Sequence, residues 1–143
     1  MKHYEENLDL PQIPYDFLLL ADEIELLTCA TPELWEHGYG SFIPENPELE
    51  EFLAPYFDSD ITVRYQMILN DLPAHTDICE QSWKYNFLYD NGGTDVTTEW
   101  WQDGEVTDTL RAKVHEWCRF NVKIEHSVTG ILYPRLSITV KLS

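Results

Sequence analysis

The sequence predicts a mainly β fold preceded by one or two helices. Segments rich in β-branched and aromatic residues dominate after residue 60, turn signals separate them, and helical periodicity is confined to the part before them. Many short strands that follow a pair of helices are typical of a β-sandwich or barrel. The length of 143 residues fits one domain. We expect residues 1–60 to form a helical or irregular support and residues 61–143 to form the β core.

Two segments before the β core have helical character. Residues 15–28 carry an apolar band with acidic residues between its members, and Pro14 stands where a helix favours proline. Residues 47–57 form a second, shorter candidate. Pro32 and residues 38–40 predict a loop between the two.

The expected strands follow one another closely along the rest of the chain. They cover residues 61–69, 83–89, 95–101, 105–107, 114–117, 121–128 and 133–142. Residues 91–93 predict a turn, and Asp103-Gly104 suits a tight hairpin. A doubly wound α/β fold would need helices between the strands. Only residues 107–117 can supply one, so that class is set aside.

The strand at residues 83–89 alternates strictly between two kinds of side chain. Trp83, Tyr85, Phe87 and Tyr89 fall on one face, with Lys84 and Asn86 on the other. We expect the aromatic face to pack against the N-terminal helices. The adjacent residues Trp100 and Trp101 should point one into the core and one out of it, since neighbours in a strand face opposite ways.

The charge and the cysteine content of the chain limit which binding partners and which cellular compartment we expect. With 9 basic and 26 acidic residues, the net charge of −17 repels phosphate backbones and anionic membranes, so neither nucleic acid nor a membrane is an expected partner. Cys29, Cys79 and Cys118 are an odd number with no C-x-x-C pair, which disfavours a disulfide framework. The first residues show no signal peptide, and the longest apolar run, residues 17–21, is short. We expect a cytoplasmic protein.

A metal-binding pattern stands at His75-Thr76-Asp77. Residues two apart in an extended strand face the same side, so the imidazole of His75 and the carboxylate of Asp77 can meet at one ion. A histidine from a distant strand would complete two His and one carboxylate, the ligand set typical of non-haem Fe(II) oxygenases. His126 is the preferred third ligand, and His115 is the alternative.

Arg135 lies nine residues after His126, and Ser137 shares its face of the last expected strand. A guanidinium offers a planar fork that matches a carboxylate, and a hydroxyl adds a donor. An inward arginine is costly unless an anion pairs with it. That anion is either a bound dicarboxylate or one of the chain's own acidic residues.

In this order, the H-x-D pair, the distal histidine and the arginine resemble the 2-oxoglutarate and Fe(II)-dependent oxygenase superfamily. The resemblance covers residues 61–142 and implies a double-stranded β-helix, a jelly-roll of cupin-like type. The distal arginine of the superfamily falls about ten residues past the second histidine. Here the gap is nine, and a bulge or shorter turn at Gly130 accounts for the difference.

The nearest branch is the aspartyl/asparaginyl β-hydroxylase-like or prolyl-hydroxylase-like group, which includes small bacterial and phage members. This implies that Lys84 and Asn86 line the cosubstrate pocket, and that Arg135 and Ser137 hold the far carboxylate of 2-oxoglutarate. The implied activity is hydroxylation of a small molecule or peptide side chain. The alternatives are a non-catalytic binding or structural jelly-roll, and a cupin-like metalloenzyme that does not use 2-oxoglutarate.

Overall fold

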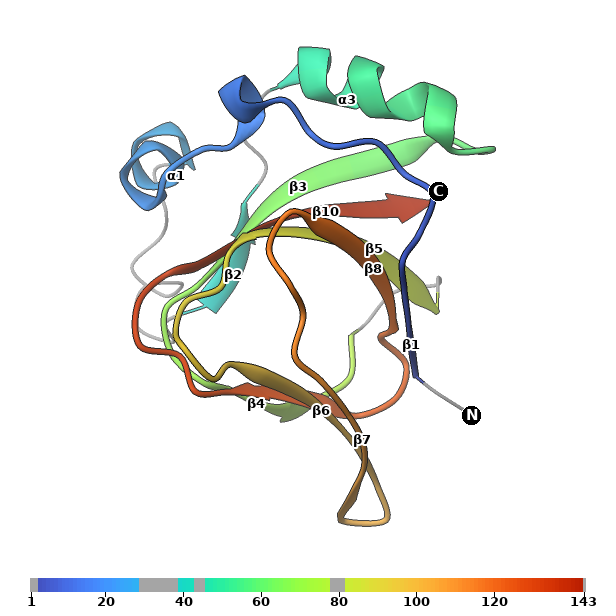
Figure 1. The fold of residues 1–143 in the computed structure, drawn as a ribbon, viewed down its shortest axis with the longest axis vertical. Coiled ribbons are helices and arrows are strands. Elements are labelled where there is room, and N and C mark those ends of the chain that lie inside the picture. The colour runs from blue at the N-terminus through green and yellow to red at the C-terminus, as the bar shows by residue number, and fades with distance from the viewer. Residues whose placement is uncertain (1–2, 29–38, 43–45, 78–81, 143) are drawn as a thin grey trace.

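A computed structural model describes residues 3–28, 39–42, 46–77 and 82–142, without the side chains of residues 27, 28 and 39–42. The fold is mainly β, with two antiparallel sheets stacked face to face and the helices above the larger one (Figure 1). The six-stranded sheet has the spatial order β1 (Tyr4–Glu6), β8 (Glu116–Asn121), β5 (Trp83–Asp90), β10 (Arg135–Leu142), β3 (Ile61–Ile68) and β2 (Tyr39–Phe42). The four-stranded sheet has the order β4 (Leu72–His75), β9 (His126–Thr129), β6 (Thr97–Gln102) and β7 (Glu105–Leu110). The antiparallel pairing confirms that the fold is not of the doubly wound class.

Eight of these strands pair in a nested order along the chain. β3 pairs with β10, β4 with β9, β5 with β8 and β6 with β7, all antiparallel. The chain from β3 to β10 is therefore one long two-stranded ribbon that folds back on itself at the β6–β7 turn. That turn is the expected hairpin at Asp103-Gly104, and both residues have positive φ, 52° and 78°.

The helices cover the outer face of the six-stranded sheet. α1 (Ala21–Thr28) and α3 (Pro47–Leu53) place Ile24, Leu49 and Leu53, all fully buried, against that face. α3 begins at an Asn46 cap whose side chain accepts a hydrogen bond from the Leu49 N–H. Short 3₁₀ helices lie at Tyr15–Phe17 and Ala54–Tyr56. None of the helices in the described part of the chain has the length and apolarity needed to cross a membrane.

The expected single helix over residues 15–28 is wrong, because residues 18–20, between the 3₁₀ helix at Tyr15–Phe17 and α1, are not helical. Two tyrosine hydroxyls from the sheet satisfy backbone carbonyls at this break. Tyr65 donates to the carbonyl of Phe17 at 2.8 Å, and Tyr89 donates to that of Leu19 at 2.6 Å. These tertiary bonds replace the helical ones that the apolar band predicted.

β10 is the central strand of the whole arrangement, and six successive residues of it are buried. Leu136, Ile138 and Val140 face the helices and belong to the largest hydrophobic cluster, while the polar residues between them face the four-stranded sheet. In β5, Tyr85, Phe87 and Tyr89 pack on the same helix side as expected. Trp83 departs from this pattern and lies under the Arg119 guanidinium, 4.5 Å from it.

Several observed strands differ in their bounds from the expected ones, and others were not expected at all. Residues 114–117 were expected to be extended, but His115 has a positive φ of 62° and β8 begins only at Glu116. The expected strand at residues 121–128 is instead the end of β8, a turn and the start of β9. β1 was not predicted, and β2 falls partly on the expected loop at residues 38–40. Both are short edge strands, each paired with a single neighbouring strand among the described residues.

The adjacent residues Trp100 and Trp101 differ in burial, as expected for neighbours in a strand. Trp100 is fully buried between the sheets, whereas Trp101 is half-buried and donates its indole N–H to Ser127 Oγ at 2.9 Å. Cys118 is a buried free thiol. Cys29 and Cys79 lie outside the described residues, as do Pro32 and Gly38.

We predict that Ile138→Ala lowers the free energy of unfolding by about 2–5 kcal/mol, because it opens a cavity beneath the helices in the central strand. Ile138 has no exposed surface. Leu132→Ala is the control, since Leu132 is 73% exposed and its truncation should change stability by about 0.5 kcal/mol or less. Urea denaturation measures both variants, and equal losses would contradict the assignment of the core.

Candidate metal centre

The three residues of the predicted triad come from β4, the segment that follows it, and β9. His75 is the last residue of β4 and His126 the first of β9, and the two are Cα partners across the strand pair. Asp77 lies two residues beyond the end of β4, where its N–H donates to the Val122 carbonyl at 3.0 Å. Strand register therefore places the two imidazoles side by side, and a backbone bond holds the carboxylate next to them.

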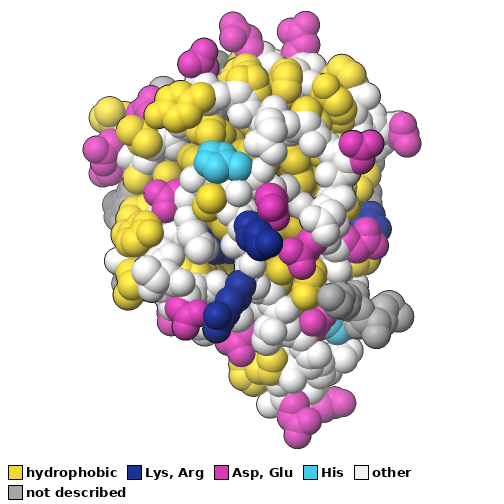
Figure 2. Space-filling model, viewed as in Figure 1, with side chains coloured by type: hydrophobic (Ala, Val, Ile, Leu, Met, Phe, Trp, Pro, Cys, Tyr) yellow, Lys and Arg dark blue, Asp and Glu magenta, His cyan; other side chains and the backbone are white. Residues whose placement is uncertain are grey.

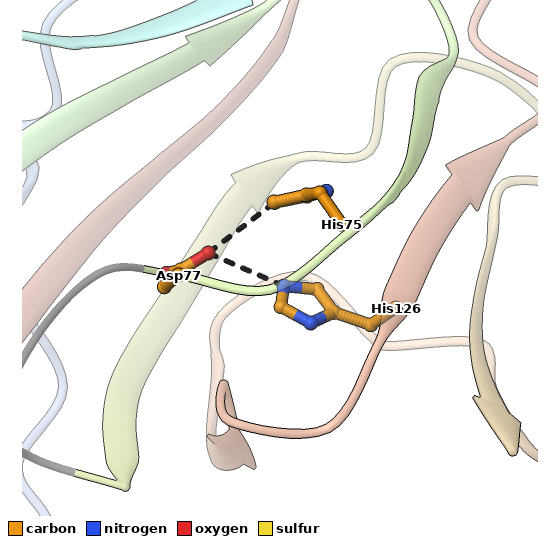
Figure 3. Close-up of side chains that lie close together, drawn as sticks. All are labelled: His75, Asp77 and His126. Atoms are coloured by element: carbon orange, nitrogen blue, oxygen red, sulfur yellow. Dashed lines mark ion pairs between the residues drawn. The ribbon is translucent and has the colours of Figure 1, made fainter.

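The three side chains converge on one point (Figure 3). Asp77 Oδ1 lies 3.2 Å from His75 Nε2 and 3.6 Å from His126 Nε2, and the three potential ligand atoms all lie within 4.8 Å of one another. The centroids of the two imidazole rings are 4.5 Å apart. Among the described residues, this is the one group of histidine, cysteine or acidic side chains with such spacing. His115, the alternative ligand, is exposed and is not part of it.

Both histidines are oriented by the same local contact. His75 Nδ1 lies 2.8 Å from the Pro73 carbonyl, and His126 Nδ1 lies 2.8 Å from the Ile124 carbonyl. Because a carbonyl only accepts, Nδ1 carries the proton in each ring. When the rings are neutral, both Nε2 lone pairs therefore face Asp77, which is the arrangement that a metal ion needs from its imidazole ligands.

The surroundings shift the pKa values of these three groups in different directions. Burial raises the pKa of Asp77, but the hydrogen bond from His75 and the charge of Lys84 lower it, to about 2 in balance. The hydrogen bond to Asp77 raises the pKa of His75 above its ordinary value. Burial lowers the pKa of His126. The environment therefore favours the charged form of Asp77 and of His75 and disfavours that of His126.

A pocket of about 230 Å³ opens beside the three residues, between the two sheets. Its apolar walls come from both sheets and include Ile68, Leu72, Phe120 and Val128. Its polar lining consists of Gln66, Lys84, Asn86, Thr98, Arg135, Ser137 and Lys141 together with the triad. All four of the residues expected to surround a cosubstrate therefore line one cavity with the candidate metal ligands.

Lys84 and Asn86 enter this pocket from β5, and both are buried. Lys84 Nζ lies 4.0 Å from Asp77 Oδ2, so the lysine charge faces the triad. Asn86 Oδ1 is buried without a hydrogen-bond partner among the described residues. A buried amide oxygen in that state costs free energy unless a ligand or water supplies a donor.

Arg135 lies at another part of the pocket, with 5% of its surface exposed. Its Nη1 donates to the Asn91 carbonyl at 3.0 Å and to Asn91 Oδ1 at 2.6 Å. Within the described part of the chain, no carboxylate lies within 4.0 Å of the guanidinium. Burial lowers the pKa of Arg135 to about 10, so the group remains a cation at neutral pH with only neutral partners.

Ser137 and the turn at Gly92 complete the surroundings of Arg135. Ser137 Oγ donates to Gln66 Oε1 at 3.5 Å, a long bond that leaves the hydroxyl facing the pocket. Gly92 has a φ of 81°, and a Cβ built on it would lie 2.6 Å from the Cβ of Arg135. Only glycine allows the turn to approach the arginine this closely, so the turn and the guanidinium position each other.

Sequence reasoning missed several residues of the site, and only Lys141 could have been found from the sequence pattern. Lys141 has the same strand parity as Arg135 and Ser137, so extending the alternation along β10 would have placed it on their face. Gln66 lies opposite Ser137 in the register of β3 and β10, which the sequence pattern alone does not determine. Asn91 gave no such signal, since its sequence neighbours indicate only a turn.

Comparisons with protein-family models, with curated proteins and with solved structures find no match to this chain.

We predict that the two histidines titrate on opposite sides of the ordinary value, with the pKa of His75 raised and that of His126 lowered. Asp77→Asn removes the carboxylate that stabilises the His75 imidazolium, so the pKa of His75 should fall. Glu125→Gln, which changes an exposed carboxylate next to His126 in sequence, is the charge-matched control. NMR titration of the imidazole resonances measures these changes, and an unchanged His75 in the Asp77 variant would contradict the geometry.

Proposed function

We propose that the protein is a non-haem Fe(II) and 2-oxoglutarate-dependent dioxygenase that hydroxylates a small molecule or a peptide side chain. The observation that carries the proposal is one cavity lined both by two imidazoles and a carboxylate that converge on a point and by a buried guanidinium. The first group suits a metal ion with open coordination positions, and the second suits a dicarboxylate.

The nested strand pairing supports a jelly-roll of the double-stranded β-helix type. In such a fold, a long antiparallel ribbon is rolled so that its strands divide between two facing sheets. Here the four nested pairs divide in that way, with two pairs in each sheet. The candidate metal ligands lie on the β4–β9 pair of the smaller sheet, and Arg135 lies on the β3–β10 pair of the larger one. The pocket between the sheets brings the two together.

The donor set fits Fe(II). His75, Asp77 and His126 would hold the ion through two neutral imidazole nitrogens and one carboxylate oxygen, the facial arrangement used by iron oxygenases. Bound iron together with 2-oxoglutarate and dioxygen would supply the oxidising chemistry, which converts 2-oxoglutarate to succinate and CO₂ and hydroxylates a C–H bond. Pro73 and Ile124 keep the Nε2 atoms of the two histidines aimed at the ion, through the bonds that their carbonyls accept from Nδ1.

The chain's other polar groups would bind and orient the cosubstrate. The Arg135 guanidinium would pair with the far carboxylate of 2-oxoglutarate, which supplies the anion that its neutral partners do not. Ser137 would add a hydroxyl donor to the same carboxylate. Lys84, beside Asp77, would balance the charge of the near carboxylate. The apolar walls at Leu72 and Phe120 limit water around these groups and strengthen their interactions.

We predict that Fe(II) and 2-oxoglutarate, added together without oxygen, produce a visible charge-transfer absorption, and that admitting oxygen releases succinate. His75→Ala should weaken metal binding by more than about 100-fold, because it removes one of three protein ligands. His115→Ala is the matched control and should keep both properties, since that imidazole lies outside the cluster. Absence of both signals at saturating iron and 2-oxoglutarate would leave a binding or structural jelly-roll as the better interpretation.

Arg135→Ala should weaken 2-oxoglutarate binding about 30-fold or more, because loss of a buried charged partner costs about 2 kcal/mol or more. Metal affinity should change little. Arg111→Ala is the control, since Arg111 is exposed and pairs with Asp95 at the surface. Calorimetric titration of the zinc-loaded protein measures both affinities. Undiminished 2-oxoglutarate affinity in the Arg135 variant would favour a cupin-like metalloenzyme that does not use this cosubstrate.

A further inference from the structure

The pocket concentrates positive charge in a strongly acidic protein. The chain has 9 basic and 26 acidic residues, and Figure 2 shows acidic side chains spread over the face that it presents. Three of the nine basic residues, Lys84, Arg135 and Lys141, line the pocket, where Asp77 is the one acidic group among the described lining residues. A cavity whose charge opposes that of the surface is suited to anionic ligands.

Two of these cations face each other across neighbouring strands. Val140 pairs with Tyr85 in the β10–β5 register, so the next pair brings Lys141 opposite Lys84. Both side chains line the pocket, so they share the face that looks toward the four-stranded sheet. Like charges opposite each other in a sheet are destabilising. Asp77 faces Lys84 at 4.0 Å, but no carboxylate of the described residues lies within 4.0 Å of Lys141.

A further cation lies next to this pair on β3. Arg64 pairs with Thr139, two residues from Lys141 on the same face of β10. Its Nε is buried and has no hydrogen-bond partner among the described residues. Lys84 and Lys141 therefore form one end of the pocket, which we name the lysine end. Arg64 adds positive charge beside it on the inner face of the six-stranded sheet but does not line the pocket.

The lysine end is separate from Arg135. Arg135 and Lys141 are six residues apart in one strand, which at about 3.3 Å per residue separates their Cα atoms by about 20 Å. A five-carbon dicarboxylate that is held by Arg135 is far shorter than this. The two regions of positive charge are therefore suited to two different anions.

We infer that the substrate is itself an anion, a free carboxylic acid or a carboxylate side chain, and that it binds at the lysine end through Lys141. This inference rests on the proposed function. Three basic side chains and one carboxylate give the pocket two net positive charges, with the histidines neutral. Fe(II) would add two and 2-oxoglutarate would remove two, so two remain for a second anion to neutralise.

The test uses probe pairs that differ in a single charge. Protein loaded with Zn(II) and saturated with 2-oxoglutarate is titrated calorimetrically with aspartate and with asparagine, and then with the N-acetylated amides of both. The free and capped forms distinguish a free acid from a peptide side chain. We expect at least one aspartate form to bind about five- to tenfold more tightly than its asparagine counterpart, as one desolvated charge pair allows.

Lys141→Gln should abolish the preference for aspartate, while Lys113→Gln, at an exposed position outside the pocket, should retain it. Equal melting temperatures would show that the folds are intact. No preference in the unaltered protein, or the same preference in the Lys141 variant, overturns the inference. Weaker 2-oxoglutarate binding in that variant, with the aspartate preference intact, also overturns it. If 2-oxoglutarate does not bind the unaltered protein, the proposed function fails, and the same comparison on unloaded protein then decides whether Lys141 selects an anion.

Discussion

The alternation of side chains along β10 is the constraint on which the rest of the structure depends. Leu136, Ile138 and Val140 bury their side chains beneath the helices, so the hydrophobic stabilisation of the sheet comes mainly from its outer face. The inner face is thereby free to carry polar and charged groups such as Arg135 and Ser137. Burial of a guanidinium without a carboxylate is costly, and the strand tolerates it because its opposite face is so well packed.

Much of the candidate site follows from sequence because strand geometry is regular. The two-residue spacing of His75 and Asp77 and the alternation of Arg135 with Ser137 are local patterns that place side chains on a common side of an extended chain. The alignment of His75 with His126 across the strand pair could not be predicted from these local patterns, because strand register depends on turns and bulges between distant segments. The turn at residues 122–125, which brings the Val122 carbonyl to Asp77, was likewise expected to be extended.

Other features could not be predicted because tertiary contacts override local preference. The apolar band at residues 15–28 has helical periodicity. The helix is nevertheless interrupted in the middle of this segment, where the hydroxyls of Tyr65 and Tyr89 donate hydrogen bonds to backbone carbonyls. The three-residue β1 strand is positioned by backbone pairing with β8, by the stacking of buried Tyr4 on Trp100 and by the Arg119–Glu5 ion pair at 2.8 Å. In these places a distant partner decides the local conformation.

The nested pairing of strands also has a consequence for folding. Ile61 and Leu142 are register partners, so the first and last core strands meet only when the entire ribbon between them has been made. Contacts of such sequence separation carry a large loop-closure entropy and slow the folding rate. A nascent chain synthesised only as far as β7 would have the β6–β7 hairpin but neither Arg135 nor the β10 strand beneath the helices. Synthesis of β10 therefore completes the pairing of the larger sheet and supplies Arg135 and Lys141 to the pocket.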